Sequence, residues 1–255
     1  MSNDTSSIKS KFIAGSISGI TEVICTHPID LIKTKIQEAS QKNIVINDPI
    51  KYFYGKYKFY GFQYLYNGFI PRIIGIVPMS FIYWGVQGNS NEYLKKYNIK
   101  DSSRLVLSGI LAGSAQTLID NPIETIKIRQ MTSTKKSYII SKNVIFSGFG
   151  PTLSRNSLFA AIVNYTIYIS PSENYSTYFF KGALGGLIAS ILTQPLDYIK
   201  TEKQRVTINK RSIKNIIISD YKFFMTGAIP RATLGLLNMG IGITIYTFMT
   251  KHILF

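Results

Sequence analysis

The residues best placed to do chemistry in this chain are carboxylates and lysines that recur in one pattern. HPIDLIKTKIQ, NPIETIKIRQM and QPLDYIKTEKQ each carry a proline, an acid two positions later and a lysine three positions after that. An acid and a lysine three apart share one helix face, and buried charges in an apolar chain are costly unless they pair. The pattern therefore predicts ion pairs between helices that bend at their prolines. The members are Pro28, Asp30 and Lys33; Pro122, Glu124 and Lys127; and Pro195, Asp197 and Lys200.

Other kinds of chemistry find little support. Cys25 is the single cysteine, and His27 and His252 are the only histidines, which is too few for a disulfide or for a zinc or iron site. The sequence has no glycine-rich nucleotide loop of the G-x-G-x-x-G or Walker type. A nucleophile, a base and an orienting acid cannot be assembled either. We expect no enzyme activity, no metal and no cofactor.

The motifs belong to a longer internal repeat. Each follows, at a constant distance, a pair of glycines four residues apart; these pairs are Gly15 and Gly19, Gly109 and Gly113, and Gly182 and Gly186. Between the motifs, FIPRIIGIVP, FGPTLSRNSL and AIPRATLGLL each follow a further glycine, which is Gly68, Gly148 or Gly227. A repeat of this length predicts one structural unit used several times. We place three units at residues 8–98, 102–171 and 175–251.

The elements that must hold these residues are apolar enough to lie in a membrane. The chain of 255 residues has a net charge of +16, yet only 16% of its residues are charged. Residues 73–91, 156–172 and 232–250 contain no Asp, Glu, Lys or Arg, and they alternate with the motif-bearing segments 12–37, 105–130 and 181–204. We predict an all-α membrane protein with six transmembrane helices. A soluble helical bundle would need charged outer faces, and a soluble nucleic-acid-binding protein would be richer in charge.

The triple proline motif with its upstream glycine pairs resembles the mitochondrial carrier family of solute transporters, over nearly the whole chain. The resemblance implies a barrel of six helices in three tandem, pseudo-threefold repeats. It implies a multi-pass monomer in the inner mitochondrial membrane, with both termini on the intermembrane-space side. A central cavity would open alternately to either side. Cardiolipin binding at the helix ends is less secure, because the family's second half-motif is well kept only near Gly68.

The resemblance also implies two gates. On the matrix side, Asp30 would pair with Lys127, Glu124 with Lys200, and Asp197 with Lys33. Gln37 and Gln204 match the family's glutamine braces, whereas Met131 stands at the third brace position. The outer gate should be polar or aromatic and a weak barrier, because its expected positions carry no carboxylate; they are Gln87, Gly88, Ile167, Tyr168, Tyr246 and Thr247.

Substrate contacts in the family lie near the middle of the second, fourth and sixth transmembrane helices, as is usual for transporters. The matching pairs are Gly75 with Ile76, Arg155 with Asn156, and Leu234 with Gly235. Arg155 interrupts an apolar region, and its guanidinium can bind phosphate or carboxylate through two parallel hydrogen bonds. Arg72 and Arg231 lie one turn toward the matrix gate.

Three arginines without an adjacent acid predict an electropositive cavity and a small anionic substrate. An amino acid is disfavoured because its ammonium group would need a carboxylate beside the arginine, and Glu22 is the one acid that opposes this. We favour exchange of nucleotides or deoxynucleotides; the heavy use of Ile, Lys and Asn is typical of AT-rich genomes, as in some protists and giant viruses. The alternatives are dicarboxylates or keto-carboxylates, S-adenosylmethionine-like compounds, and an adaptor that keeps the carrier fold without transport.

Overall fold

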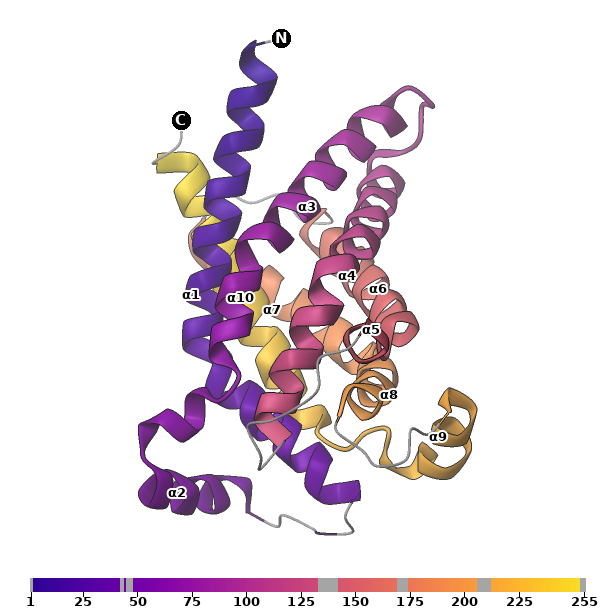
Figure 1. Ribbon diagram of the computed structural model, residues 1–255. Helices are drawn as coiled ribbons and strands as arrows, with labels where there is room; N and C mark the ends of the chain where they lie inside the picture. Colours follow the sequence, from indigo (N-terminus) through magenta and orange to yellow (C-terminus); the bar gives the residue numbers. More distant parts are fainter. Residues whose placement is uncertain are drawn as a thin grey trace.

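The long helices of the protein form a closed ring (Figure 1). The computed structural model describes residues 2–41, 44, 48–132, 142–168, 174–205 and 212–252, and every element within these ranges is helical. Each long helix packs against the next in the order α1, α3, α4, α6, α7 and α10, and α10 returns to α1. Their bounds are α1 Ser2–Gln41, α3 Phe69–Lys95, α4 Asp101–Thr132, α6 Phe149–Tyr168, α7 Tyr175–Leu192 with its continuation α8 Gln194–Gln204, and α10 Ala228–His252.

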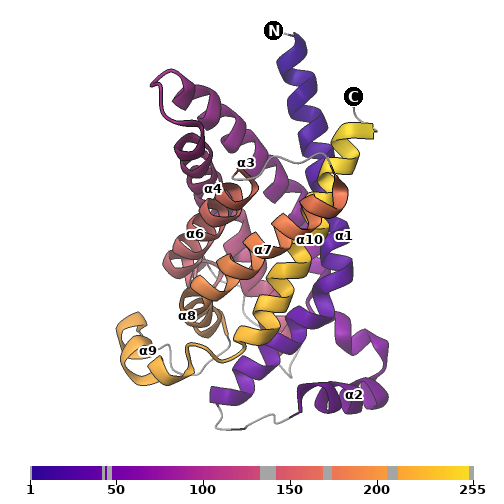
Figure 2. The same ribbon diagram turned by 180° about the vertical axis from the view of Figure 1, so that it is seen from behind.

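Short helices gather at one end of the ring. Figures 1 and 2 show α2 and α9 at the end opposite to the two chain termini. Phe53 of α2 is buried with Leu31 and Met131, and Ile216 of α9 is buried with Tyr198, so small apolar clusters fix both helices. The short elements are α2 Pro49–Tyr60, η1 Phe62–Tyr66, α5 Lys142–Ile145, α9 Ile213–Asp220 and η2 Tyr221–Phe223.

Several of the long helices could cross a membrane by length and composition. Three described stretches qualify, namely Phe12–Ala39, Phe62–Lys95 and Ala228–His252. The bent pair α7 and α8 would make a fourth span if it is counted as one. Helices α4 and α6 do not reach this measure. The all-helical class is therefore confirmed, with several helices apolar enough to cross a membrane, whereas the number of six spans stays a prediction.

The three prolines affect their helices differently. Helices α1 and α4 continue through Pro28 and Pro122 without a break. The third segment is interrupted at Thr193, where α7 ends and α8 begins at an angle of 66°. Pro195 lies in the first turn of α8, where its missing N–H costs no hydrogen bond. The break thus occurs where the sequence lets one helix end and another start.

The glycine pairs bring neighbouring helices close together. A Cβ at Gly15 would collide with Trp84 of α3, one at Gly113 with the backbone of Asn156 in α6, and one at Gly186 with the backbone of Gly235 in α10. Close backbone approach of this kind is the usual role of small residues between membrane helices. The pairs therefore pack α1 on α3, α4 on α6 and α7 on α10.

The glycines that precede α3, α6 and α10 share an unusual backbone conformation. Gly68, Gly148 and Gly227 have φ values of 82°, 74° and 78°, in the left-handed region that favours glycine. Gly68 lies against Lys127 of α4, Gly148 against Lys200 of α8, and Gly227 against Gln37 of α1. Each glycine thus contacts the motif helix of the following unit, and the third contact returns to the first unit.

Replacing Gly148 with alanine should lower the free energy of unfolding by about 1–2 kcal/mol, because alanine disfavours the left-handed conformation. Gly85→Ala is the matched control: Gly85 lies inside α3 with nothing within 4 Å of an added Cβ. Alanine there should raise stability by about 0.5–1 kcal/mol. Thermal unfolding of the purified protein in detergent measures both variants. A Gly148→Ala protein as stable as the wild type would show that the left-handed turn is not required.

Candidate functional site

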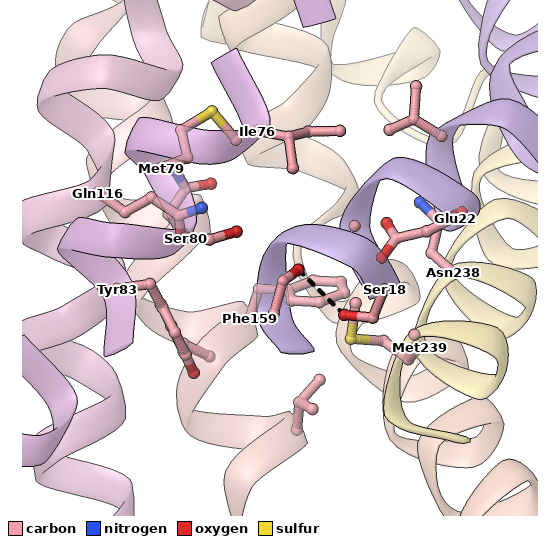
Figure 3. Close-up of a pocket in the computed structure, with 18 of the residues that line it drawn as sticks. Ser18, Glu22, Ile76, Met79, Ser80, Tyr83, Gln116, Phe159, Asn238 and Met239 are labelled. Carbon is pink, nitrogen blue, oxygen red and sulfur yellow. Dashed lines mark hydrogen bonds between the residues drawn. The ribbon is translucent and has the colours of Figure 1, made fainter. Parts of the chain in front are cut away.

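A cavity of about 620 Å³ lies inside the ring of helices. Its wall includes Glu22 of α1, Asp120 of α4, Arg155 of α6, Ser190 of α7 and Arg231 of α10, and α3 contributes several more residues. Figure 3 shows Met79, Ser80 and Tyr83 of α3 on one side of this space and Glu22, Asn238 and Met239 on the other. All six long helices therefore contribute to one site.

Three ion pairs between helices close the cavity at the end nearest α2. Lys127 donates to Asp30 at 2.7 Å, and Lys200 pairs with Glu124. Lys33 pairs with Asp197, which completes a ring from α1 through α4 and α8 back to α1. The structure thus brings together all six residues that were expected to form the matrix gate, in the expected partnerships. These charges are buried: the side chain of Lys200 is 1% exposed and that of Asp197 is fully buried. Pairing offsets the cost of burying them.

A second layer of charges lies just above the ring, and it corrects the expectation of arginines without adjacent acids. Arg72 donates to Asp120 at 2.9 Å, and Arg155 donates to Asp120 at 3.1 Å. Arg155 also reaches Asp197 at 3.2 Å, and Arg231 forms an ion pair with the same carboxylate. Every one of the three arginines therefore has a carboxylate partner. The expectation was wrong because only the folded ring brings α4 and α8 next to these side chains.

Asp120 is the candidate functional residue that sequence reasoning missed. It stands two positions before Pro122, after a stretch of α4 that carries no charge from Leu105 to Ile119, and it is 3% exposed. An ionisable residue in such a region is a functional candidate by default, and this signal could have found it.

Asn156 fixes the geometry of this layer. Its amide nitrogen donates to Asp120 at 2.9 Å and to Thr117 at 3.1 Å. Its amide oxygen accepts from two nitrogens of Arg155, at 3.0 and 2.6 Å. Asn156 thereby holds the guanidinium and the Asp120 carboxylate in one arrangement.

The other expected contact residues divide into two groups. Ile76, Leu234 and Gly235 line the cavity together with the arginines. Gly75 does not: it is buried where a Cβ would collide with Ile123 of α4. Gly75 is therefore corrected to a helix-packing position, because the rotation of α3 presents Ile76 to the cavity instead.

Within the described residues, the glutamine braces form no hydrogen bond with the ring. The amide nitrogen of Gln204 donates to Asn121 at 2.9 Å, and neither amide atom of the buried Gln37 has a hydrogen-bond partner in the part of the chain that the structure describes. Met131 packs with Leu31 and Phe53. A brace role for the two glutamines stays a prediction for another conformation.

The other end of the cavity carries polar and aromatic contacts among α3, α6 and α10. Trp84 of α3 stacks on Tyr246 of α10, with ring centroids 4.5 Å apart. Asn164 of α6 donates to Tyr83 at 3.3 Å and accepts from Gln87 at the same distance. These contacts agree in chemical character with a polar or aromatic outer gate, whose function stays a prediction.

The residue before each proline has a shared role that the sequence reading overlooked. His27 contacts the backbone oxygen of Asn67 at 3.0 Å. Asn121 and Gln194 donate to the backbone oxygens of Ile145 and Thr226, at 2.8 and 2.9 Å. Each of these buried polar side chains ties a motif helix to the segment that leads into the next long helix. The signal was the polar residue that stands before all three prolines.

The charges along the cavity are nearly balanced. Five cationic side chains face four carboxylates, and no group of His, Cys, Asp and Glu within the described ranges could hold a metal ion. The cavity can therefore bind both an anionic and a cationic group. The charged residues are Lys33, Arg72, Lys127, Arg155 and Arg231, with Glu22, Asp30, Asp120 and Glu124.

A ring of apolar helices around a charged cavity that ion pairs close at one end is the architecture of a membrane solute transporter. The family described as "Mitochondrial carrier protein" matches residues 4–98. The chain is 30% identical to mitochondrial RNA-splicing protein MRS3 of Saccharomyces cerevisiae, over 76% of this chain and 68% of that protein. It belongs to the mitochondrial carrier family. It is accordingly a transporter of a small solute, not an enzyme, and a multi-pass protein of the inner mitochondrial membrane.

Two further relatives carry names that describe transport. The human mitochondrial glycine transporter is 27% identical, over 93% of this chain and 88% of its own length. The human electrogenic aspartate/glutamate antiporter SLC25A12, mitochondrial, is 28% identical over 76% of this chain, which corresponds to 32% of that longer protein.

Proposed function

We propose that this carrier transports a small amino acid across the inner mitochondrial membrane by alternating access. The observation that carries the proposal is the position of Arg155 between Asp120 and Asp197, inside the cavity. A guanidinium binds the carboxylate of an amino acid, and a nearby acid is needed for its ammonium group. The names of the relatives that transport glycine, aspartate or glutamate support the same substrate class.

Arg155 also offers a route by which substrate opens the matrix gate. Asp197 accepts from Arg155 and belongs to the gate through Lys33. A substrate carboxylate that binds Arg155 competes with Asp197, and it thereby weakens a contact that holds α8 in the closed ring. A ligand shifts a conformational equilibrium only through different affinities for the two states, and this competition provides the difference.

Exchange of nucleotides or deoxynucleotides is the second candidate. The cavity volume of about 620 Å³ and the rings of Tyr83 and Trp84 in its wall favour it, because a base could stack there. Its main argument has become weaker, since it depended on arginines without carboxylate partners. An amino acid makes use of both signs of charge in the cavity, whereas a nucleotide leaves the acids unmatched.

The same proposal includes the membrane arrangement. All six long helices cross the bilayer in three repeats, at residues 8–98, 102–171 and 175–251; the end of the second, residues 169–171, lies outside the described residues. The cyclic glycine contacts and the cyclic ion pairs support this division. The ion-pair ring serves as the matrix gate, and the carrier works as a monomer surrounded by membrane lipid, including cardiolipin.

Uptake into liposomes tests the proposal. Purified protein is reconstituted, preloaded with one unlabelled compound or left empty, and offered labelled glycine, aspartate, ATP, dATP, 2-oxoglutarate or S-adenosylmethionine in turn. We expect uptake of an amino acid, faster when the liposomes contain unlabelled substrate. Uptake of ATP or dATP alone would favour the nucleotide candidate, and no uptake of any compound would favour a non-transporting adaptor.

A further inference from the structure

Glu22 is a carboxylate in the cavity that forms no ion pair with any of the described residues. It lies on α1, lines the cavity and is partly buried. The positive charge of Arg72 interacts with Glu22 electrostatically, but the two side chains are too far apart to form an ion pair in the described structure. The other lining carboxylates, Asp30, Asp120 and Glu124, all have cationic partners. A charge left unpaired in the interior of a membrane protein is costly, and such residues typically serve function.

Two further residues with oxygen acceptors, Ser18 and Asn238, stand in the cavity wall together with Glu22. Ser18, one turn earlier on α1, donates its hydroxyl hydrogen to the backbone oxygen of Gly15 at 3.1 Å, so its oxygen can only accept (Figure 3). The side-chain oxygen of Asn238, on α10, is buried and has no hydrogen-bond partner. Figure 3 shows Ser18, Glu22 and Asn238 on the same side of the cavity.

Gly242 makes room for this arrangement. It lies one turn after Asn238 on α10, and a Cβ there would come within 3.0 Å of a carboxylate oxygen of Glu22. The carboxylate of Glu22 therefore lies against the α10 face that also carries Asn238, and glycine leaves the space that this position requires.

We propose that Glu22, Asn238 and Ser18 form a subsite for the ammonium group of the transported amino acid. An ammonium group carries three N–H donors and no acceptor, which complements three acceptors that lack donors. The substrate carboxylate binds the arginine layer while its ammonium group binds Glu22, so the two ends contact different helices. The inference rests on the proposed function and assigns the residues that select an amino acid over a carboxylic acid without an amine.

The test compares glycine with glycolate, which keeps the carboxylate and replaces the ammonium group by a hydroxyl. Wild-type protein in liposomes takes up labelled glycine, and unlabelled glycolate should compete roughly 10- to 100-fold less well than unlabelled glycine, because a charged hydrogen-bonded contact is missing. In Glu22→Gln this preference should fall to roughly threefold or less, and Asn238→Ala should cause a smaller loss. Glu92→Gln is the matched control, because its carboxylate is exposed, pairs with Lys95 and lies outside the cavity.

Folding of the variant is checked by thermal unfolding in detergent. Glu22→Gln should melt at or above the wild-type temperature, because an unpaired, partly buried charge is removed. Glycine should raise the melting temperature of the wild type but not that of the variant. If the wild type transports glycine and Glu22→Gln keeps the full preference over glycolate, the subsite is wrong while the proposed function stands. Equal loss of glycine and glycolate binding would also overturn the subsite. If the wild type transports no amino acid, both fail.

Discussion

Arg155→Ala should lower the rate of amino-acid uptake by about 100-fold or more, because in the proposed function the guanidinium supplies two charged hydrogen bonds to the substrate carboxylate. The variant should still fold. Asp120 keeps its ion pair with Arg72, and Asp197 keeps its ion pairs with Lys33 and Arg231. Uptake into liposomes and a melting curve of the same preparation measure the two effects separately.

Two controls sharpen this experiment. Arg155→Lys keeps the charge but loses the planar, two-pronged donor, so uptake should be intermediate. Arg104→Ala removes an arginine that pairs with Asp101 and lies outside the cavity, and uptake should stay close to wild type. Normal uptake by Arg155→Ala would exclude Arg155 from the substrate site and would contradict the proposed coupling to the gate.

Glu124→Gln should lower the free energy of unfolding by about 3–5 kcal/mol, because it breaks a buried pair and leaves a charge without its partner. Glu124 pairs with Lys200 and Lys127 and lies 3.6 Å from Arg72. Lys200 would lose the ion pair that accompanies its burial. The measurement is thermal or denaturant unfolding in detergent micelles.

A double variant distinguishes the loss of the ion pair from the cost of a buried charge left without a partner. Glu124→Gln combined with Lys200→Gln should be more stable than Glu124→Gln alone, because no unpaired charge remains at that position. Glu92→Gln, which breaks an exposed pair, should cost about 1 kcal/mol or less. If Glu124→Gln were no less stable than Glu92→Gln, the ring would not hold the closed end together.

Much of the fold could be predicted because the same residue spacing and order of charges recur in each repeat. The spacing of Pro28, Asp30 and Lys33 returns twice with the same order of charges, and the glycine pairs return with it. Three copies of an interacting motif can satisfy each other only in a cyclic arrangement, and the three ion pairs have this arrangement. Helix packing at the glycine pairs follows from the same local pattern.

The details of the cavity could not be predicted in the same way. Gly75 and Ile76 are neighbours in sequence, and only the rotation of α3 turns Ile76 to the cavity and Gly75 to Ile123. The bend of 66° between α7 and α8 occurs at one proline motif, while α1 and α4 continue through theirs. A similar motif thus gives different local geometry in different tertiary surroundings.

By itself, the sequence determined the class of protein and the repeat, because these follow from composition and from spacings along the chain, and its resemblance to the mitochondrial carrier family implied the partners within the ion-pair ring. Only the tertiary structure decided the charge balance of the cavity. Arg155, Asp120 and Asp197 come from three helices, and electrostatic interaction depends on distances of a few ångströms across the ring. Spacing within one helix carries no information on those distances. For this physical reason, the sequence alone favoured a nucleotide as the substrate, whereas the substrate that we propose from the structure is an amino acid.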